Sequence, residues 1–311
     1  MRVAIGQVAP AFLDLAGSVA KACDMIAEAG RRGVRLLAFP EAWLPCYPLW
    51  CDTGTLGKWE NKPSKRLHAR LLRNSLAIPS RESHELCAAA RNAGVAVVVG
   101  ANERAPTGGS LYNALLFIDE RGAIVGIRRK LVPTLGERLV WAYGDAAGLE
   151  SFALGGARVG GLICWEHWMP LARQVLHAAG EEIHVAAWPH GKEPHQLASR
   201  HYAFEGRAFV LASALYLRKA DLPDDFELAD DFRGAPEELL PGGSAIIAPD
   251  GSYVVEPVFG REELLVTDLE LGRSSEEKLA LDVAGHYARP DLFELRVRRD
   301  RLEPLRDAER D

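Results

Sequence analysis

Short apolar runs typical of β-strands recur along the whole chain, and segments with helical periodicity separate several of them. The strand-like runs cover 3–8, 36–39, 95–100, 114–118, 124–127, 158–164, 184–188, 209–213, 244–248 and 264–268. The helical segments cover 18–29, 82–93 and 170–179. This alternation predicts an α/β protein. Because the connections at 119–122 and 249–251 are turn sequences, we expect mixed sheets in which some neighbours are antiparallel.

The chain has 311 residues, of which 48% are apolar, and no Ser/Gly-rich linker divides it. We therefore expect a single domain over 1–290, followed by a short charged tail over 291–311. Two segments are expected to be irregular. The segment 43–79 is rich in tryptophan and would line or cover a pocket. The acidic segment 219–242 is typical of a solvated surface loop, with substrate gating or subunit contact as the alternative.

The formal net charge of −6 gives no electrostatic reason to expect binding to nucleic acid or to an anionic membrane surface. The opening residues lack the long apolar core of a signal peptide, and no stretch approaches the roughly 20 apolar residues of a membrane span. A cytoplasmic location is the expectation. The five cysteines are scattered and odd in number, which argues against a disulfide framework.

Three residues whose side chains could take part in catalysis follow strand-like runs. Cys164 follows the run that contains Gly160 and Gly161, Glu41 follows 36–39, and Lys130 follows 124–127. Each residue alone has an ordinary explanation: a buried strand cysteine, a surface carboxylate or a solvated lysine. Clefts in α/β sheets lie at the carboxyl ends of strands, so together they suggest a nucleophile, a base and a cation in one cleft.

The chain resembles the nitrilase branch of the carbon–nitrogen hydrolase superfamily. The likeness covers most of the sequence and rests on motifs in the family's order. These are Phe39-Pro40-Glu41-Ala42-Trp43, Arg129-Lys130-Leu131-Val132-Pro133-Thr134 with Glu137-Arg138 and Trp141, Gly144-Asp145, Cys164-Trp165-Glu166-His167, Gly242-Gly243-Ser244 and Gly285-His286-Tyr287-Ala288-Arg289-Pro290-Asp291. The resemblance implies an α-β-β-α sandwich with mixed sheets.

The resemblance also implies the catalytic roles. Cys164 would attack a nitrile carbon to give a covalent thioimidate, and Glu41 would be the general base. Lys130 would stabilise the charge that develops on the substrate, and Glu137 would orient the site. Ammonia and a carboxylic acid would be the products. No metal or organic cofactor is implied, and the expected partners are a small nitrile and further copies of the chain, as a homodimer or a larger homo-oligomer.

Aromatic residues favour an aromatic or arylaliphatic nitrile, although core packing could use the same side chains. The expected pocket residues are Tyr47, Trp50, Trp165 and Trp188. An amidase or a cyanide-hydrolysing relative would share the catalytic residues, and an inactive binding or scaffold homologue is the alternative from another class.

The histidines have simpler interpretations. His167 lies only three residues after Cys164, and this spacing favours a structural role over that of a catalytic base. The set His184, His190, His195 and His201 matches no common zinc-binding pattern.

Overall fold

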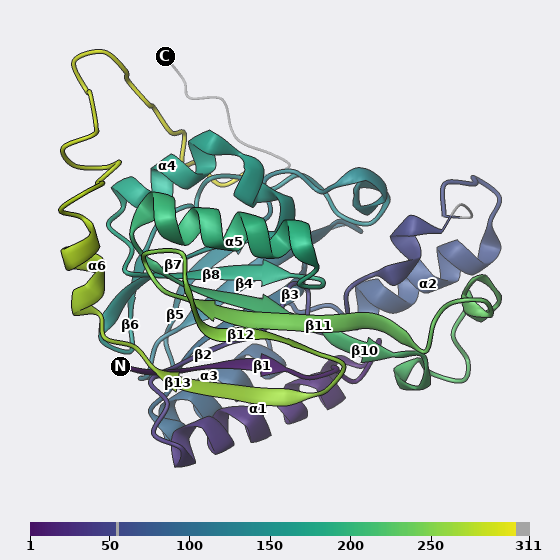
Figure 1. Ribbon diagram of the computed structural model, residues 1–311. Helices are drawn as coiled ribbons and strands as arrows, with labels where there is room; N and C mark the ends of the chain where they lie inside the picture. Colours follow the sequence, from purple (N-terminus) through teal and green to yellow (C-terminus); the bar gives the residue numbers. More distant parts are fainter. Residues whose placement is uncertain (54–55, 303–311) are drawn as a thin grey trace.

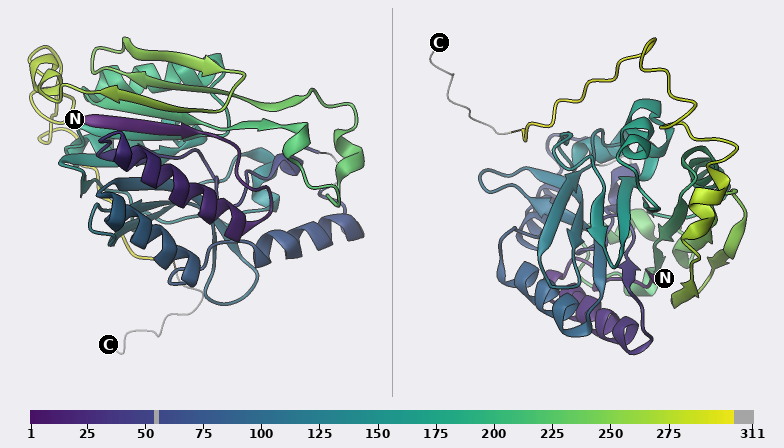
Figure 2. Two further views of the ribbon diagram at one scale, coloured as in Figure 1. Left: turned by 90° about the horizontal axis from the view of Figure 1, so that it is seen from below. Right: turned by 90° about the vertical axis from the view of Figure 1, so that its left-hand side faces the viewer.

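Two mixed sheets stack face to face, and helices cover their outer sides, which gives the four-layer α/β sandwich visible in Figures 1 and 2. The computed structural model describes residues 1–53 and 56–302. The expected fold class is confirmed, and both sheets combine parallel and antiparallel neighbours.

The first sheet has β1 near one edge and places parallel and antiparallel pairs side by side. Its strands, in spatial order, are β13 (Glu263–Asp268), β1 (Arg2–Gln7), β2 (Leu36–Ala38), β3 (Ala96–Arg104), β4 (Leu111–Ile118) and β5 (Ile124–Arg129). The strands β1, β2 and β3 are parallel, whereas β4 and β5 return antiparallel after short loops.

The second sheet repeats this plan. Its strands, in spatial order, are β10 (Tyr216–Arg218), β11 (Glu238–Ile247), β9 (Phe209–Ala214), β8 (Ile183–Trp188), β7 (Ala157–Ile163) and β6 (Phe152–Leu154), and β12 (Tyr253–Phe259) pairs with β11. The parallel strands β7, β8 and β9 form its centre.

Two helices cover each sheet. Helices α1 (Leu15–Arg31) and α3 (Arg81–Ala93) lie under the first sheet, and α4 (Pro170–Ala178) and α5 (Glu193–Gly206) lie over the second (Figure 1). The Asp14 and Ser80 side chains cap the amino ends of α1 and α3, and Gly94 ends α3 in the left-handed conformation.

The alternation along β1 shows how the strand pattern builds two core layers. Val3 and Ile5 join the core cluster that contains Leu211 of β9, whereas Ala4 joins the cluster that contains Val19 of α1. Successive strand residues point to opposite faces, so one short apolar run supplies both layers.

Several elements differ from the sequence-based expectation. The segment 43–79 is not irregular throughout, because α2 (Lys62–Arg73) forms within it, and residues 54–55 lie outside the described part. Only Leu67 and Leu71 give α2 a buried apolar contact, so its polar sequence hid the helix. The segment 219–242 contains the 3₁₀ turns Lys219–Asp221 and Ala229–Phe232, and its end already belongs to β11.

Helix α5 was also missing from the expectation. Its buried face includes the polar side chains of His195, Gln196 and Ser199, which break the apolar stripe that a helix normally shows. Strands β6 and β10 have only three residues each, and β12 is longer but has no buried residue, so none of them stands out in the sequence.

After helix α6 (Gly272–Glu277) the chain runs along the outside of the molecule (Figures 1 and 2). Arg299 and Arg301 of this segment donate hydrogen bonds to the carbonyl oxygens of Leu149 and Ile127. Residues 303–311 of the expected tail lie outside the described part. Within 1–53 and 56–302, no helix combines the length and apolar character needed to cross a membrane.

We expect Gly100→Ala to destabilise the fold at the point where β3 supports Glu41. A Cβ atom on Gly100 would lie 2.0 Å from the Pro40 carbonyl oxygen and 2.7 Å from the Ala42 nitrogen. Overpacking of this kind costs ~1–3 kcal/mol, which should appear as a lower midpoint of thermal unfolding. Gly109→Ala is the matched control, because nothing lies within 4 Å of its added Cβ. Equal midpoints for the two variants would contradict this account.

Candidate active site

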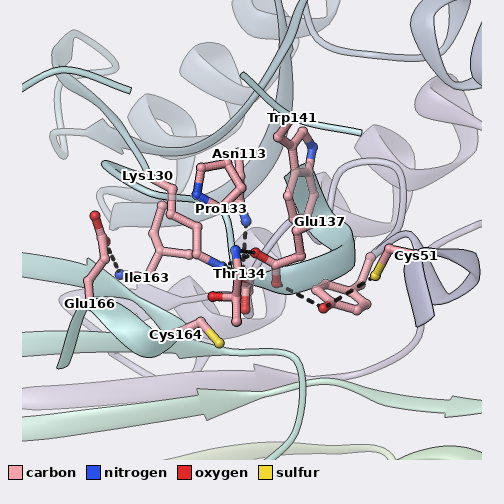
Figure 3. A network of polar contacts seen from close by, with 12 residues as sticks. Cys51, Asn113, Lys130, Pro133, Thr134, Glu137, Trp141, Ile163, Cys164 and Glu166 are labelled. Carbon is pink, nitrogen blue, oxygen red and sulfur yellow. Dashed lines mark hydrogen bonds and ion pairs between the residues drawn. The ribbon is translucent and has the colours of Figure 1, made fainter. Parts of the chain in front are cut away.

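The three candidate residues lie just beyond strand ends on facing sheets. Glu41 follows β2, Lys130 follows β5 and Cys164 follows β7. Because β2 and β5 belong to the first sheet and β7 to the second, stacking of the sheets brings the three side chains together. Figure 3 shows Cys164 and Glu166 at the end of β7, across from Lys130, Thr134 and Glu137.

A buried lysine lies between two buried carboxylates. Lys130 Nζ is 2.8 Å from Glu41 Oε1 and 2.6 Å from Glu137 Oε2, and all three residues are at most 3% exposed. The other donors to these carboxylates are Asn113 Nδ2 to Glu41, and Tyr47 Oη and the Thr134 backbone N–H to Glu137. The structure therefore brings together Glu41, Lys130 and Glu137 as the sequence predicts.

The sulfur of Cys164 completes this group. Cys164 Sγ, one carboxylate oxygen of Glu41 and one of Glu137 all lie within 4.8 Å of one another. Glu41 Oε2 is buried and has no hydrogen-bond partner among the described residues. It is therefore the carboxylate atom available to accept a proton.

Cys164 adopts a backbone conformation that is unfavourable for a side chain other than glycine. Its φ is 52°, and it begins the 3₁₀ turn Cys164–Trp168 directly after β7. Left-handed residues of this kind cost free energy and persist where neighbouring contacts hold them. The reversal of direction presents the thiol at the strand end.

Glu166 holds the two sides of the site together, a role that the sequence analysis missed. Its Oε2 accepts the Ile163 backbone N–H at 2.8 Å, and its Oε1 accepts hydrogen bonds from Arg128 Nη2 and the Leu131 N–H, both at 2.7 Å. Glu166 and Arg128 are at most 1% exposed. One carboxylate thus links the residues next to Cys164 and Lys130. No local pattern indicates this role, because the linked segments are far apart in sequence.

Burial dominates the electrostatics of the site. Burial raises the pKa of Glu41 to about 7; the Lys130 ammonium opposes this rise and the Glu137 charge adds to it. Burial would lower the pKa of Lys130, but Glu41, Cys164 and Glu137 raise it above its usual value. Burial, followed by the Glu41 charge, raises the pKa of the Cys164 thiol well above its usual value. The resting site therefore holds the Lys130 ammonium, the neutral Cys164 thiol and the Glu41 carboxylate, which titrates near neutral pH.

The expected pocket residues occupy different environments. Tyr47 belongs to the cluster, because its hydroxyl donates to Glu137 Oε1 at 2.9 Å. Trp165 is 53% exposed and packs against Trp168. Trp188 is buried, stacks on His167 and donates to the Ser199 hydroxyl. Trp50 is buried between Phe12 and Phe226.

A cavity of about 290 Å³ opens beside Tyr47. Three of its lining residues, Asp52, His190 and Lys192, can carry charge, and the others offer mainly apolar surface. The complete lining is Tyr47, Leu49, Asp52, Pro189, His190, Lys192, Phe232, Ala235, Pro236, Leu239 and Leu240. Pro189 and His190 directly follow β8, the neighbour of β7. Tyr47 lines this cavity and also donates to Glu137, so one side chain connects the cavity with the ion cluster.

The donor set does not fit a metal ion. Within the described residues, Glu41, Glu137 and Cys164 form the only group of three candidate ligands close enough together. Lys130 Nζ already binds both carboxylates and supplies the positive charge that a metal would bring. His184, His190, His195 and His201 do not form such a group in the described part of the chain.

Comparison with known proteins agrees with this geometry. Residues 2–278 match the family described as carbon-nitrogen hydrolase. The chain is 40% identical to Nitrilase 2 from an unknown prokaryotic organism over 312 aligned residues, covering 99% of this chain and 95% of the relative.

The chain belongs to the nitrilase branch of the carbon–nitrogen hydrolases. It is also 38% identical to an aliphatic nitrilase from Rhodococcus rhodochrous, over 96% of this chain and 79% of that protein. Among solved structures, a carbon-nitrogen hydrolase from Helicobacter pylori G27 has a TM-score of 0.70 at 16% identity, with 90% of this chain and 92% of that one covered. That likeness shows the shared fold. The resemblance inferred from the sequence motifs is thus confirmed.

We expect the activity of this carbon–nitrogen hydrolase to depend on a carboxylate that titrates near pH 7. Below this pH Glu41, whose pKa is raised to about 7, takes up a proton and can no longer accept one from Cys164. The value of kcat/KM should therefore fall about tenfold per pH unit on the acid side and level off above it.

In Glu41→Gln the rate should drop by about 10²–10⁴-fold, and the residual activity should lack this acid limb. Circular dichroism at each pH, and recovery of activity on return to pH 8, separate titration from acid unfolding. A wild-type profile that stays flat down to pH 5 would contradict the assignment of Glu41.

Proposed function

We propose that this hydrolase is a nitrilase that converts an organic nitrile to the carboxylic acid and ammonia through a covalent adduct on Cys164. The observation that supports it most strongly is the cluster of Cys164 Sγ with the carboxylates of Glu41 and Glu137 around Lys130 Nζ. Relatives that are 36–40% identical to this chain are named nitrilases, and one that is 33% identical is named a bifunctional nitrilase/nitrile hydratase, which supports the same reaction class.

In the first half of the reaction the thiol proton moves to Glu41 as sulfur attacks the nitrile carbon. A carbon–sulfur bond forms, one π bond of the nitrile breaks, and the nitrogen takes the proton from Glu41 to give a thioimidate, which returns Glu41 to its carboxylate form. Because the nitrogen gains negative charge during attack, the ammonium of Lys130 stabilises the transition state at a dry, preorganised site. Glu137 keeps Lys130 in place through the 2.6 Å contact.

In the second half two water molecules complete the hydrolysis. Glu41 removes a proton from the first water as it adds to the thioimidate and passes this proton to the nitrogen. The hydroxyl proton of the tetrahedral intermediate follows it, so the carbon–nitrogen bond breaks with loss of ammonia and a thioester remains. A second water, activated in the same way, releases the carboxylic acid and returns the thiol. The raised pKa of Glu41, about 7, suits a group that must both accept and give up protons near neutral pH.

We further propose an aromatic or arylaliphatic nitrile as substrate. The 290 Å³ cavity beside Tyr47 supports this, because Tyr47, Phe232, Leu239 and Leu240 offer apolar surface for a ring. The single domain over 1–290, the homodimer or larger homo-oligomer and the cytoplasmic location stay predictions from the sequence.

A substrate panel tests the proposal. Ammonia and acid should be released from benzonitrile or phenylacetonitrile faster than from an aliphatic nitrile, cyanide or the matching amides. Cys164→Ala should abolish turnover with thermal unfolding unchanged, whereas Cys87→Ala, on helix α3, serves as the matched cysteine control and should stay active.

Other outcomes would assign another function. Faster hydrolysis of the amides would identify an amidase, and release from cyanide alone would identify a cyanide hydrolase. A folded wild-type protein that turns over none of these compounds, and whose Cys164 resists alkylation by iodoacetamide, would favour the inactive binding homologue.

A further inference from the structure

A chain of buried polar groups leads from the backbone of Cys164 to the layer between the second sheet and helices α4 and α5. His167 Nδ1 lies 2.7 Å from the Cys164 carbonyl oxygen, and His167 Nε2 lies 3.1 Å from His184 Nε2. His184 Nδ1 lies 2.9 Å from Glu181 Oε2. The three side chains are at most 2% exposed. The proposed reaction uses none of these side chains, although this series of hydrogen bonds ends at the backbone of the proposed nucleophile.

The positions of the protons along this chain follow from its two ends. A carbonyl oxygen cannot donate, so the 2.7 Å contact with Cys164 requires a proton on His167 Nδ1. Burial, followed by the effect of His184, holds the pKa of His167 well below its usual value, so the ring is neutral and Nε2 is an acceptor. His184 must therefore donate from Nε2 to His167.

The last contact needs one more proton. Burial would raise the pKa of Glu181, but His184 and His177 lower it to about 2, which leaves an ionised carboxylate. A carboxylate accepts and does not donate, so the contacts need one proton more than two neutral rings carry. The 2.9 Å contact between His184 Nδ1 and Glu181 Oε2 is where this proton is held; burial lowers the pKa of His184, and the carboxylate opposes that lowering.

Groups from every neighbouring element hold this pair in place. Tyr202 of α5 stacks on the His184 ring with centroids 3.7 Å apart, and its hydroxyl donates to Glu181. His177 of α4 lies 3.5 Å from the same carboxylate, whereas the cation of Arg128 on β5 opposes charge on both histidines. Arg173 of α4 donates to the His167 carbonyl oxygen at 2.9 Å. The His167 ring therefore has a fixed position and a fixed tautomer.

The peptide plane between Cys164 and Trp165 connects the His167 contact to the catalytic site. A trans peptide is planar, so its C=O and N–H point in opposite directions, and fixing one fixes the other. The Trp165 N–H belongs to this plane and lowers the pKa of the Cys164 thiol, against the larger effect of burial. Cys164 has a φ of 52°, a conformation that needs such support.

We propose that His167 is a positioning residue that, backed by His184 and Glu181, holds the Cys164 carbonyl oxygen and so aims the Trp165 N–H at the Cys164 sulfur. The sequence analysis gave His167 a structural role; the contact with the backbone of Cys164 extends that role to the reactivity of the thiol. This inference rests on the proposed function only in taking Cys164 as the nucleophile.

The test measures the alkylation of Cys164 by iodoacetamide as a function of pH, without any nitrile, by mass spectrometry of the Cys164 peptide. His167→Asn keeps an N–H donor at the same number of bonds from the backbone as Nδ1, whereas His167→Leu fills similar space without one. Because hydrogen bonds to charged groups are the stronger kind, we expect His167→Leu to slow alkylation by about tenfold or more, and His167→Asn to stay within about threefold of wild type. The value of kcat should follow alkylation, with KM little changed.

Glu181→Gln tests the two supporting residues. Its amide N–H can donate to His184 Nδ1 while its oxygen still accepts from Tyr202, so neutral groups can make all the hydrogen bonds of the chain. We expect alkylation at the wild-type rate.

Thermal unfolding confirms that each variant is folded. The proposal is overturned if folded His167→Leu reacts like wild type, or if folded His167→Asn or Glu181→Gln is as slow as His167→Leu. The expected alkylation pattern in an enzyme that hydrolyses no nitrile would contradict the proposed function and leave this inference standing.

Discussion

The buried ion cluster of Lys130 with Glu41 and Glu137 is the interaction on which the rest of the site depends. Removing charged groups from water is costly, and the attraction among them compensates only when the geometry is good and the remaining polar atoms are satisfied. Here Asn113, Tyr47 and Thr134 supply the additional donors. Burial raises the pKa of Glu41 to about 7, although the Lys130 ammonium opposes this rise, and burial together with the Glu41 charge raises the pKa of Cys164 well above its usual value.

The fold forms this cluster by bringing the ends of strands from two sheets together. Glu41 and Lys130 come from one sheet and Cys164 from the other, so the site forms only when the two sheets stack. Glu166 then ties the segments next to Lys130 and Cys164 to each other with one carboxylate. On the far side of Cys164, His167 contacts the carbonyl oxygen of the same residue, whose left-handed backbone needs support.

The sequence predicts the parts of this arrangement that leave a local signal. Strand periodicity places Glu41, Lys130 and Cys164 after strands, and the motifs connect them with Glu137. Contacts between distant segments leave no such signal: Asn113 on Glu41, Glu166 on Leu131 and Glu181 on His184 emerge only from the folded chain. Aromatic content is equally ambiguous, because Tyr47 reaches the catalytic cluster while Trp50 packs between two phenylalanines. Helix α5 was missed since its buried face is partly polar.

The most direct test of the account is the mass of the Cys164 peptide after a single turnover. Glu41→Gln enzyme, in excess over a reactive nitrile, would be quenched in acid, digested and analysed for a substrate-derived adduct. The account predicts a thioimidate or acyl group on Cys164, because the thiol is a much stronger nucleophile than water: without Glu41 it still adds slowly to the nitrile, whereas water adds to the adduct more slowly still. Consumption of the nitrile with no adduct on Cys164, or with the adduct on another residue, would contradict it.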